Sequence, residues 1–194
     1  MKYFFLILMC SMSICFAKEQ NIPKNWDLLI SKNQISEKIQ EVAEKLNKDY
    51  KGKDVVLVMV MKGSILFVSD LMREVSPHLT LEYIRCRSYY GGTERKKLLV
   101  EGVEKLHLQD KHVLVVDDIF DSGNTLTQVV TQIQKLKPAS LQTLVLLNKK
   151  TGRRLKDAIV PDFSLFEIRD VFVVGYGLDF DEKFRGLDAI YYIK

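Results

Sequence analysis

The stretch VLVVDDIFDSGNTL (113–126) decides the fold expected for this chain. Four aliphatic residues run into two adjacent aspartates, and a third aspartate follows after two more residues. Ser, Gly, Asn and Thr then open an apolar pattern of helical period. A continuous run of valine and leucine is typical of a strand covered on both faces of a sheet. We therefore predict a strand at 113–116, an acidic turn, and a helix at 126–137.

The order of strand, turn and helix recurs along the chain. DVVLVMVM (54–61) is a second valine-rich run, KGS interrupts it, and ILFVSDLMREV (65–75) has helical periodicity. An amphipathic helix is expected at 36–50, with Ser36 as its N-cap. Further apolar runs with polar ends stand at 79–90, 141–150, 170–180 and 187–194, and a charged, glycine-bearing hairpin or loop is expected at 91–110. These patterns predict one α/β domain with an open, mainly parallel sheet flanked by helices.

Composition limits the classes of partner. The 29 basic and 25 acidic residues give a net charge of +4, evenly mixed along the chain, so small anions are expected as ligands and nucleic acid is not. The three cysteines form no C-x-x-C pair or other metal-binding spacing. Residues 1–17, MKYFFLILMCSMSICFA, have the lysine, apolar run and small terminal residue of a signal peptide, with an over-extended start or an idle apolar tail as alternatives. We expect the domain at 18–194, with no membrane segment.

The acids lie where a ligand site is expected. In an open parallel sheet, ligands bind beyond the carboxyl ends of the strands, and Asp117, Asp118 and Asp121 come at such an end. The SGNT turn that follows (122–125) would direct helix-start N–H groups at a phosphate. Alternatively, the acids are helix caps and the glycine merely makes a turn. A cap needs only one carboxylate, so the pattern favours a phosphate ligand with a metal or a polyhydroxylated group beside it.

This stretch resembles the phosphoribosyl-pyrophosphate (PRPP) signature of the type I phosphoribosyltransferases. VMKGS, RSYYGGT, LLNKK and FEIRDVFVVGYGLDFDEKFRGL resemble the hypoxanthine-guanine branch, and the match runs in order over 26–194. The resemblance implies the type I phosphoribosyltransferase fold, with a small hood and a mobile loop over the site. It also implies a purine salvage enzyme that transfers the 5-phosphoribosyl group from PRPP to hypoxanthine or guanine, giving IMP or GMP and pyrophosphate.

The resemblance assigns roles to individual residues. Asp121 would be the catalytic proton acceptor facing N7 of the purine. Asp117, Asp118 and Asp179 would hold Mg2+, the implied cofactor. The residues implied to bind PRPP are Lys62, Gly63, Ser88, Tyr89, Asp117, Asp118, Asp121, Ser122, Gly123, Asn124, Thr125 and Arg185. The purine site would consist of Lys149, Phe172, Val173 and Asp179: Phe172 stacks on the base, the Val173 backbone reads the ring edge and Lys149 donates to O6.

Some features depart from the branch pattern. The acid pair is Asp-Asp where Glu-Asp is more usual, and Arg169 and Val171 replace a proline and a lysine near the base pocket. A xanthine-preferring enzyme is therefore one alternative, and a non-catalytic nucleotide-sensing regulator on the same fold is another. Lys149, Phe172 and Asp179 together favour the enzyme. The resemblance further implies a homodimer or homotetramer, and PRPP as substrate implies a cytoplasmic location, with export as the alternative suggested by residues 1–17.

Overall fold

The computed structural model describes residues 22–75, 79–89 and 97–194. Residues 1–17 and the 91–96 part of the expected loop therefore lie outside the described residues. The elements are β1 (Trp26–Ile30), α1 (Lys32–Asp49), β2 (Val55–Met61), α2 (Ile65–Glu74), β3 (Leu79–Tyr89), β4 (Lys97–Glu101), the 3-10 turn η1 (Val103–Lys105), β5 (His112–Phe120), α3 (Asn124–Gln134), β6 (Ser140–Lys150), β7 (Phe163–Arg169), β8 (Val173–Val174) and β9 (Ile190–Ile193).

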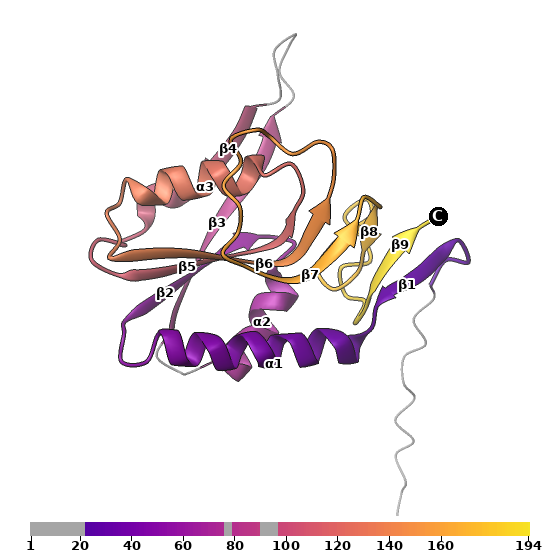
Figure 1. Cartoon of the computed structure of the whole chain (residues 1–194). Helices are drawn as coiled ribbons and strands as arrows, with labels where there is room; N and C mark the ends of the chain where they lie inside the picture. The colour runs from indigo at the N-terminus through magenta and orange to yellow at the C-terminus, as the bar shows by residue number, and fades with distance from the viewer. Residues whose placement is uncertain (1–21, 76–78, 90–96) are drawn as a thin grey trace, which may run out of the picture.

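The main sheet has six strands in the order β4-β3-β2-β5-β6-β7. All neighbouring pairs are parallel except β3 with β4, which confirms the predicted mainly parallel sheet. Alternate side chains of β2 enter two different cores. Leu57 and Met59 pack on the face that carries α1 and α2, whereas Val56 and Val58 pack on the face that carries α3. Figure 1 shows α3 on one side of the sheet and α1 and α2 on the other.

The chain reverses its winding direction between β2 and β5. From β2 it crosses one face through α2 to β3, and from β5 it crosses the other face through α3 to β6. The β2–β5 ladder ends at the pair Met59–Val116, while β5 continues along β6 as far as Phe120. The two strands therefore part at their carboxyl ends. A crevice at such a switch point is where open α/β sheets bind ligands.

The start of α1 corrects the sequence prediction. The helix begins at Lys32 with Ser31 as its N-cap, and Ser36 lies inside the helix. The Ser31 Oγ accepts from the Gln34 backbone N–H, and the Gln34 Oε1 accepts from the Ser31 N–H at 2.9 Å, so the two residues form a capping box. The S-x-x-Q spacing of Ser31 and Gln34, five residues before the predicted cap Ser36, was the signal for this start.

A second sheet forms a small hood, which we define as β1, β8, β9 and the 175–189 connection. Its strand order is β1-β9-β8, and both pairs are antiparallel. β1 near the start of the chain pairs with β9 at its end, with Trp26 opposite Ile193. In Figure 1 the hood lies beside the carboxyl ends of β5, β6 and β7. Strand β1 and strand β7 had no counterpart among the predicted strands.

Candidate functional site

The turn between β5 and α3 forms the phosphate loop, which we define as residues 121–125. Gly123 has a φ of +82° and is the N-cap of α3. A Cβ on Gly123 would lie 2.5 Å from the Cβ of Ala158, so the turn requires glycine for both backbone angle and space. Asn124 donates its N–H to the Ser122 hydroxyl at 3.3 Å. The first N–H groups of α3 lack partners within the helix and are available to an anion.

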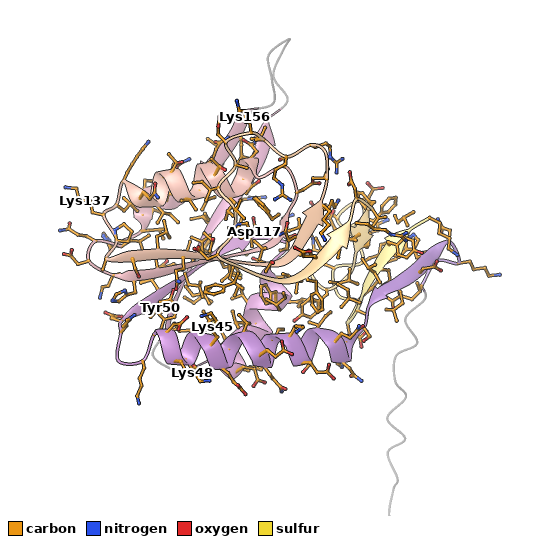
Figure 2. The ribbon with its side chains drawn as sticks, viewed as in Figure 1. Lys45, Lys48, Tyr50, Asp117, Lys137 and Lys156 are labelled. Carbon is orange, nitrogen blue, oxygen red and sulfur yellow. The ribbon has the colours of Figure 1, made fainter. Side chains whose placement is uncertain are left out.

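The acid pair lies on the last part of β5, which extends to Phe120 and not only to the predicted Val116. Asp117 is buried, and one of its carboxylate oxygens accepts from the Asp118 N–H at 2.9 Å. Figure 2 places Asp117 in the middle of the molecule, between the layers of α1 and α3. The Asp118 carboxylate packs against Gly63, where a Cβ would meet Asp118 Oδ2 at 1.8 Å. The loop after β2 and the end of β5 thus touch across the crevice.

Burial raises the pKa of Asp117 well above the ordinary carboxyl value, and the neighbouring Asp118 adds to the rise. A charged carboxylate in that position is costly, because it is removed from water and placed next to a like charge. A cation or several hydroxyl groups brought by a ligand would offset this cost.

Mg2+ is the cofactor that the resemblance implies, and it needs oxygen ligands that lie close together. No three His, Cys, Asp or Glu side chains within the described ranges lie close enough together to hold a metal ion. The implied ligands Asp117, Asp118 and Asp179 are therefore not gathered into one site. Mg2+ commonly takes one or two carboxylates and completes its shell with substrate phosphates and water. The Asp117–Asp118 pair fits that arrangement, in which the metal arrives with the substrate.

The loop after β2 meets the hood at a charged group, the Arg185 cluster, which consists of Lys62, Asp179, Glu182 and Arg185. Arg185 pairs with Asp179 at 2.6 Å and donates to the Gly177 carbonyl at 2.7 Å. Glu182 pairs with Lys62 at 2.7 Å and with Arg185 at 3.3 Å. These two cations lower the pKa of Glu182 below its ordinary value. The predicted Lys62, Asp179 and Arg185 are thus brought together, with Glu182 as an unpredicted fourth member.

Close backbone contact fixes the hood against the loop after β2. The Met61–Lys62 peptide bond is cis, and Gly63 follows it. Gly177, with a φ of +99°, lies so close that a Cβ would be 2.0 Å from the Gly63 carbonyl oxygen. Gly63 is therefore packed between the hood on one side and Asp118 on the other.

A second charged group, the Lys149 cluster, joins the phosphate loop to the ends of β6 and β7. It consists of Asp121, Lys149, Arg153 and Asp170. The Lys149 side chain is only 8% exposed and lies 3.4 Å from Asp121 and 3.9 Å from Asp170. Arg153 pairs with the same two carboxylates, at 3.1 Å and 2.8 Å. The predicted proton acceptor and the predicted O6 donor are therefore direct neighbours.

The predicted stacking residue lies beside the hood. Phe172 is 55% exposed, so it is not part of the core, and its ring meets Phe180 edge-on at 6.1 Å. Val173 is buried in β8, where its backbone pairs with Tyr192. An exposed aromatic face next to an ordered backbone edge is what a flat base requires.

Arg169 and Val171, which depart from the branch pattern near the base pocket, both pack against neighbouring side chains of the fold. The Arg169 guanidinium lies 4.7 Å from the ring centre of Tyr192 in the hood. Val171 packs against the core on the α1 and α2 side. Ser88 and Tyr89 end strand β3, but their side chains fall outside the described part of the structure.

Sequence reasoning missed the residues that support the site from the β6–β7 connection. Arg154 donates to the Lys149 carbonyl at 2.6 Å and stacks over Phe120 at 3.9 Å. Leu155 donates its N–H to the Ser122 carbonyl at 2.9 Å, which ties the connection to the phosphate loop. The available signal was the pair of arginines at 153 and 154, which follow LLNKK after Thr151 and Gly152, although basic loop residues are usually solvated. Their role depends on the sheet register, which the sequence does not display.

Comparisons with known proteins agree with this geometry. The model of the phosphoribosyl transferase domain family matches residues 25–181. The hypoxanthine-guanine-xanthine phosphoribosyltransferase of Tritrichomonas foetus is 34% identical over 167 residues, which are 86% of this chain and 91% of that protein. The hypoxanthine-guanine phosphoribosyltransferase of Staphylococcus aureus strain N315 is 36% identical over 84% of this chain and 91% of its own length. A Bacillus anthracis hypoxanthine-guanine phosphoribosyltransferase structure superposes with a TM-score of 0.76 at 36% identity, covering 87% of this chain and 98% of its own.

Proposed function

The chain belongs to the phosphoribosyltransferase family, and on that premise we propose that it is a purine salvage enzyme acting on hypoxanthine and guanine. It transfers the 5-phosphoribosyl group of PRPP to the base and releases pyrophosphate with IMP or GMP. One observation carries this proposal: the buried Lys149 ammonium lies 3.4 Å from the Asp121 carboxylate at the phosphate loop. A hydrogen-bond donor and a proton acceptor thus stand together where a 6-oxo purine presents O6 and N7.

The phosphoribosyl half of PRPP binds across the crevice between β2 and β5. The phosphate loop holds the 5′-phosphate through the N–H groups at the start of α3. Asp117 and Asp118 accept hydrogen bonds from the ribose hydroxyls, which relieves the cost of burying Asp117 next to Asp118. Lys62 and Arg185 bind the pyrophosphate, for which the planar guanidinium offers two parallel donors. Ser88 and Tyr89, at the end of β3, complete the proposed PRPP site, and the loop that follows them lies outside the described residues.

The chemical step exchanges a bond from C1′ to pyrophosphate for a bond from C1′ to a purine nitrogen. As pyrophosphate leaves with the bonding electrons, C1′ gains positive charge, which the nearby carboxylates stabilise. The attacking base loses its N7 proton to Asp121. Phe172 stacks on the base, and the Val173 backbone contacts its edge. Lys149 donates to O6, so the negative charge that develops on the ring lies next to a cation.

Mg2+ is the proposed cofactor. Bound to the pyrophosphate, it would neutralise the charge of the leaving group. Asp117 and Asp118 are the residues that would contact it from β5, whereas Asp179, the third implied ligand, pairs with Arg185 and is not gathered with them in the described structure. Two carboxylates and substrate oxygens suffice for its coordination.

Two alternatives differ in what they require of the site. A xanthine-preferring enzyme would have the same transfer chemistry and a different contact at purine C2, and one relative carries xanthine in its name. A nucleotide-sensing regulator would need the phosphate loop but not the proton acceptor. The pairing of Asp121 with Lys149 and Arg153 favours catalysis, because it holds the proposed proton acceptor beside the proposed O6 donor.

A substrate assay tests the proposal. The protein is mixed with PRPP, Mg2+ and hypoxanthine, guanine, xanthine or adenine, and the nucleotides are separated by chromatography. We expect IMP and GMP but no AMP, because the Lys149 ammonium only donates and would face the donor amino group of adenine. Equal rates with adenine and guanine would contradict the role of Lys149. No nucleotide from any base would favour the regulator.

We further propose a homodimer or homotetramer. Leu81 and Tyr83 on β3 and Leu99 on β4 are exposed on one face of the sheet edge. Exposed apolar side chains on one face of a sheet edge are commonly covered by another subunit. Light scattering after size-exclusion chromatography measures the assembly, and a monomer at micromolar concentration would contradict the proposal.

The cellular location and the role of residues 1–17 are also proposals. None of the described helices is long and apolar enough to cross a membrane. We propose a cytoplasmic enzyme whose domain comprises residues 18–194, because PRPP is made inside cells. N-terminal sequencing of the native protein, together with cell fractionation, distinguishes this from export after cleavage at Ala17. Thermal melts and turnover of the 1–194 and 18–194 chains show whether the first 17 residues contribute to the domain.

A further inference from the structure

The carboxylate of Glu182 forms ion pairs with Lys62 and Arg185, the two cations that the proposed function assigns to pyrophosphate. Its Oε2 atom lies 2.7 Å from the Lys62 Nζ and 3.3 Å from the Arg185 Nη2. A single carboxylate oxygen therefore bridges the loop after β2 and the hood. An anion that binds to both cations must meet or displace this oxygen first.

The hairpin tip of the hood delivers Glu182 to this position. Asp181 and Glu182 have φ values of 51° and 60°, and Lys183 donates its N–H to the Phe180 carbonyl at 3.0 Å. These are the features of a type I′ turn, with Glu182 at its second central position. Glu182 also donates its N–H to the Asp179 carboxylate at 2.9 Å. The turn thus orients the backbone of Glu182, while the contacts described for its carboxylate are those with Lys62 and Arg185.

The contacts of Glu182 are suited to exchange. Its side chain is 67% exposed and that of Lys62 is 44% exposed, so water solvates either group once they separate. Exposed ion pairs of this kind are weak. A pyrophosphate group carries more charge and more acceptor oxygens than one carboxylate, so it competes well for the same donors. Asp179 differs, because it is only 32% exposed and pairs with Arg185 without contacting Lys62 in the described structure.

We propose that Glu182 is an internal competitor of pyrophosphate: its carboxylate neutralises Lys62 and Arg185 in the empty site and leaves when PRPP or pyrophosphate binds. This inference rests on the proposed function, which assigns those two cations to pyrophosphate. It makes Glu182 a residue that sets substrate affinity without contacting the reacting atoms. Its effect is confined to ligands with a pyrophosphate group. A purine nucleoside monophosphate, which engages the phosphate loop and the Lys149 cluster, is not affected.

Glu182→Gln tests the inference, because the amide keeps the shape of the side chain and removes its charge. We expect the variant to bind PRPP and magnesium pyrophosphate about two- to fivefold more tightly, the range of an exposed ion pair. The affinity for GMP should remain that of the wild type. Isothermal titration calorimetry of the full chain with each of the three ligands gives these affinities. Glu182→Gly is a second variant, since glycine accepts the positive φ of the turn.

Asp181→Asn is the matched control. Asp181 lies next to Glu182 in the same exposed turn, also has a positive φ, and takes no part in the ion pairs described for the Arg185 cluster. Asp181→Asn removes the same charge as Glu182→Gln. If the net charge of the turn alone controlled affinity, both variants would bind pyrophosphate more tightly by the same factor. That result would overturn the inference. Weaker binding by Glu182→Gln would overturn it too, because Glu182 would then orient the cations productively. A wild type that binds neither PRPP nor pyrophosphate would overturn the proposed function itself.

Discussion

The Lys149 cluster and the Arg185 cluster have the same mix of charges, but their lysines differ in burial. Each combines two cations with two carboxylates at the carboxyl ends of the main sheet. In the first, the central lysine is 8% exposed, and in the second the lysine is 44% exposed. A buried charge must keep a partner at all times, whereas an exposed charge can exchange its partner for water or ligand. The first cluster is therefore suited to fixing a base, and the second to binding and releasing an anion.

This difference predicts how substitutions divide between chemistry and binding. Changes in the Lys149 cluster should act mainly on turnover and on the purine. Changes around Gly63 and the Arg185 cluster should act mainly on PRPP and pyrophosphate.

The largest effect is expected for Asp121→Asn. The amide fits the phosphate loop but cannot take up a proton, so turnover should fall by about a hundredfold or more, the usual contribution of a general base. The affinity for PRPP should stay within a few-fold of the wild type. Steady-state kinetics with guanine and a PRPP titration give both quantities. Near-normal turnover would show that another residue accepts the proton. It would also contradict the assignment of chemistry to the Lys149 cluster and of anion binding to the Arg185 cluster.

Gly63→Ala tests the other region. The added Cβ would overlap Asp118 Oδ2, and this side chain has to turn away to make room. We expect PRPP binding to weaken by about tenfold or more, on the scale of a lost charge-assisted hydrogen bond, with little loss of stability because only the end of a side chain moves. Calorimetry with PRPP measures the change.

Gly152→Ala is the matched control for Gly63→Ala. A Cβ on Gly152 would have no atom within 4 Å, and its backbone does not need a positive φ. It should bind PRPP like the wild type. Equal weakening in both variants would show that glycine flexibility, and not the contact with Asp118, controls binding.

Asp170→Asn should give a smaller effect on the purine side. Asp170 accepts from Thr151 at 3.0 Å and pairs with Arg153 and Lys149, so it holds the donor that faces the base. We expect kcat/KM for guanine to fall by about tenfold, the value of one charge-assisted hydrogen bond, while pyrophosphate affinity is unchanged. Product inhibition by pyrophosphate checks the second point. A parallel loss of pyrophosphate affinity would mean that the two clusters act as one.

The main sheet could be predicted from the sequence because its signal is local. Valine-rich runs at 55–60 and 113–116 leave no polar side chain for solvent, so they require cover on both faces. In the hood, the apolar runs at 170–180 and 187–194 contain β8 and β9, but β1 has no such signal. Strand β1 has five residues and β9 has four, and their pairing joins the two ends of the chain. β7, at the sheet edge, mixes exposed, partly buried and buried residues, which a search for continuous apolar runs does not find.

The site divides in a similar way. Residues that belong to a recognisable motif, such as Lys149 and Arg185, were found from the resemblance. Asp170, Arg153 and Glu182 were not, because a charged residue in a loop is usually only solvated. Asp170 reaches Lys149 because β7 pairs with β6 up to Lys150 and Arg169, and that register is a property of the folded sheet. Glu182 reaches Lys62 through a turn whose positive φ values occur at non-glycine residues.

Asp117 belongs to neither the Lys149 cluster nor the Arg185 cluster, and it gives the last, pH-dependent prediction. Its pKa is raised in the folded protein, so between the ordinary carboxyl value of about 3.9 and the raised value the folded state binds more protons than the unfolded chain. The free energy of unfolding therefore falls as the pH rises through this window. Asp117→Asn removes the charge and keeps an oxygen for the Asp118 N–H. Without PRPP and Mg2+, the variant should be the more stable protein at pH 7, and its advantage should shrink as the pH falls toward 4. Urea unfolding of both proteins across this pH range measures the difference in the free energy of unfolding. The variant should also bind PRPP more weakly than the wild type, because the buried charge serves substrate binding. A stability difference that does not change with pH would mean that Asp117 is already compensated in the empty site.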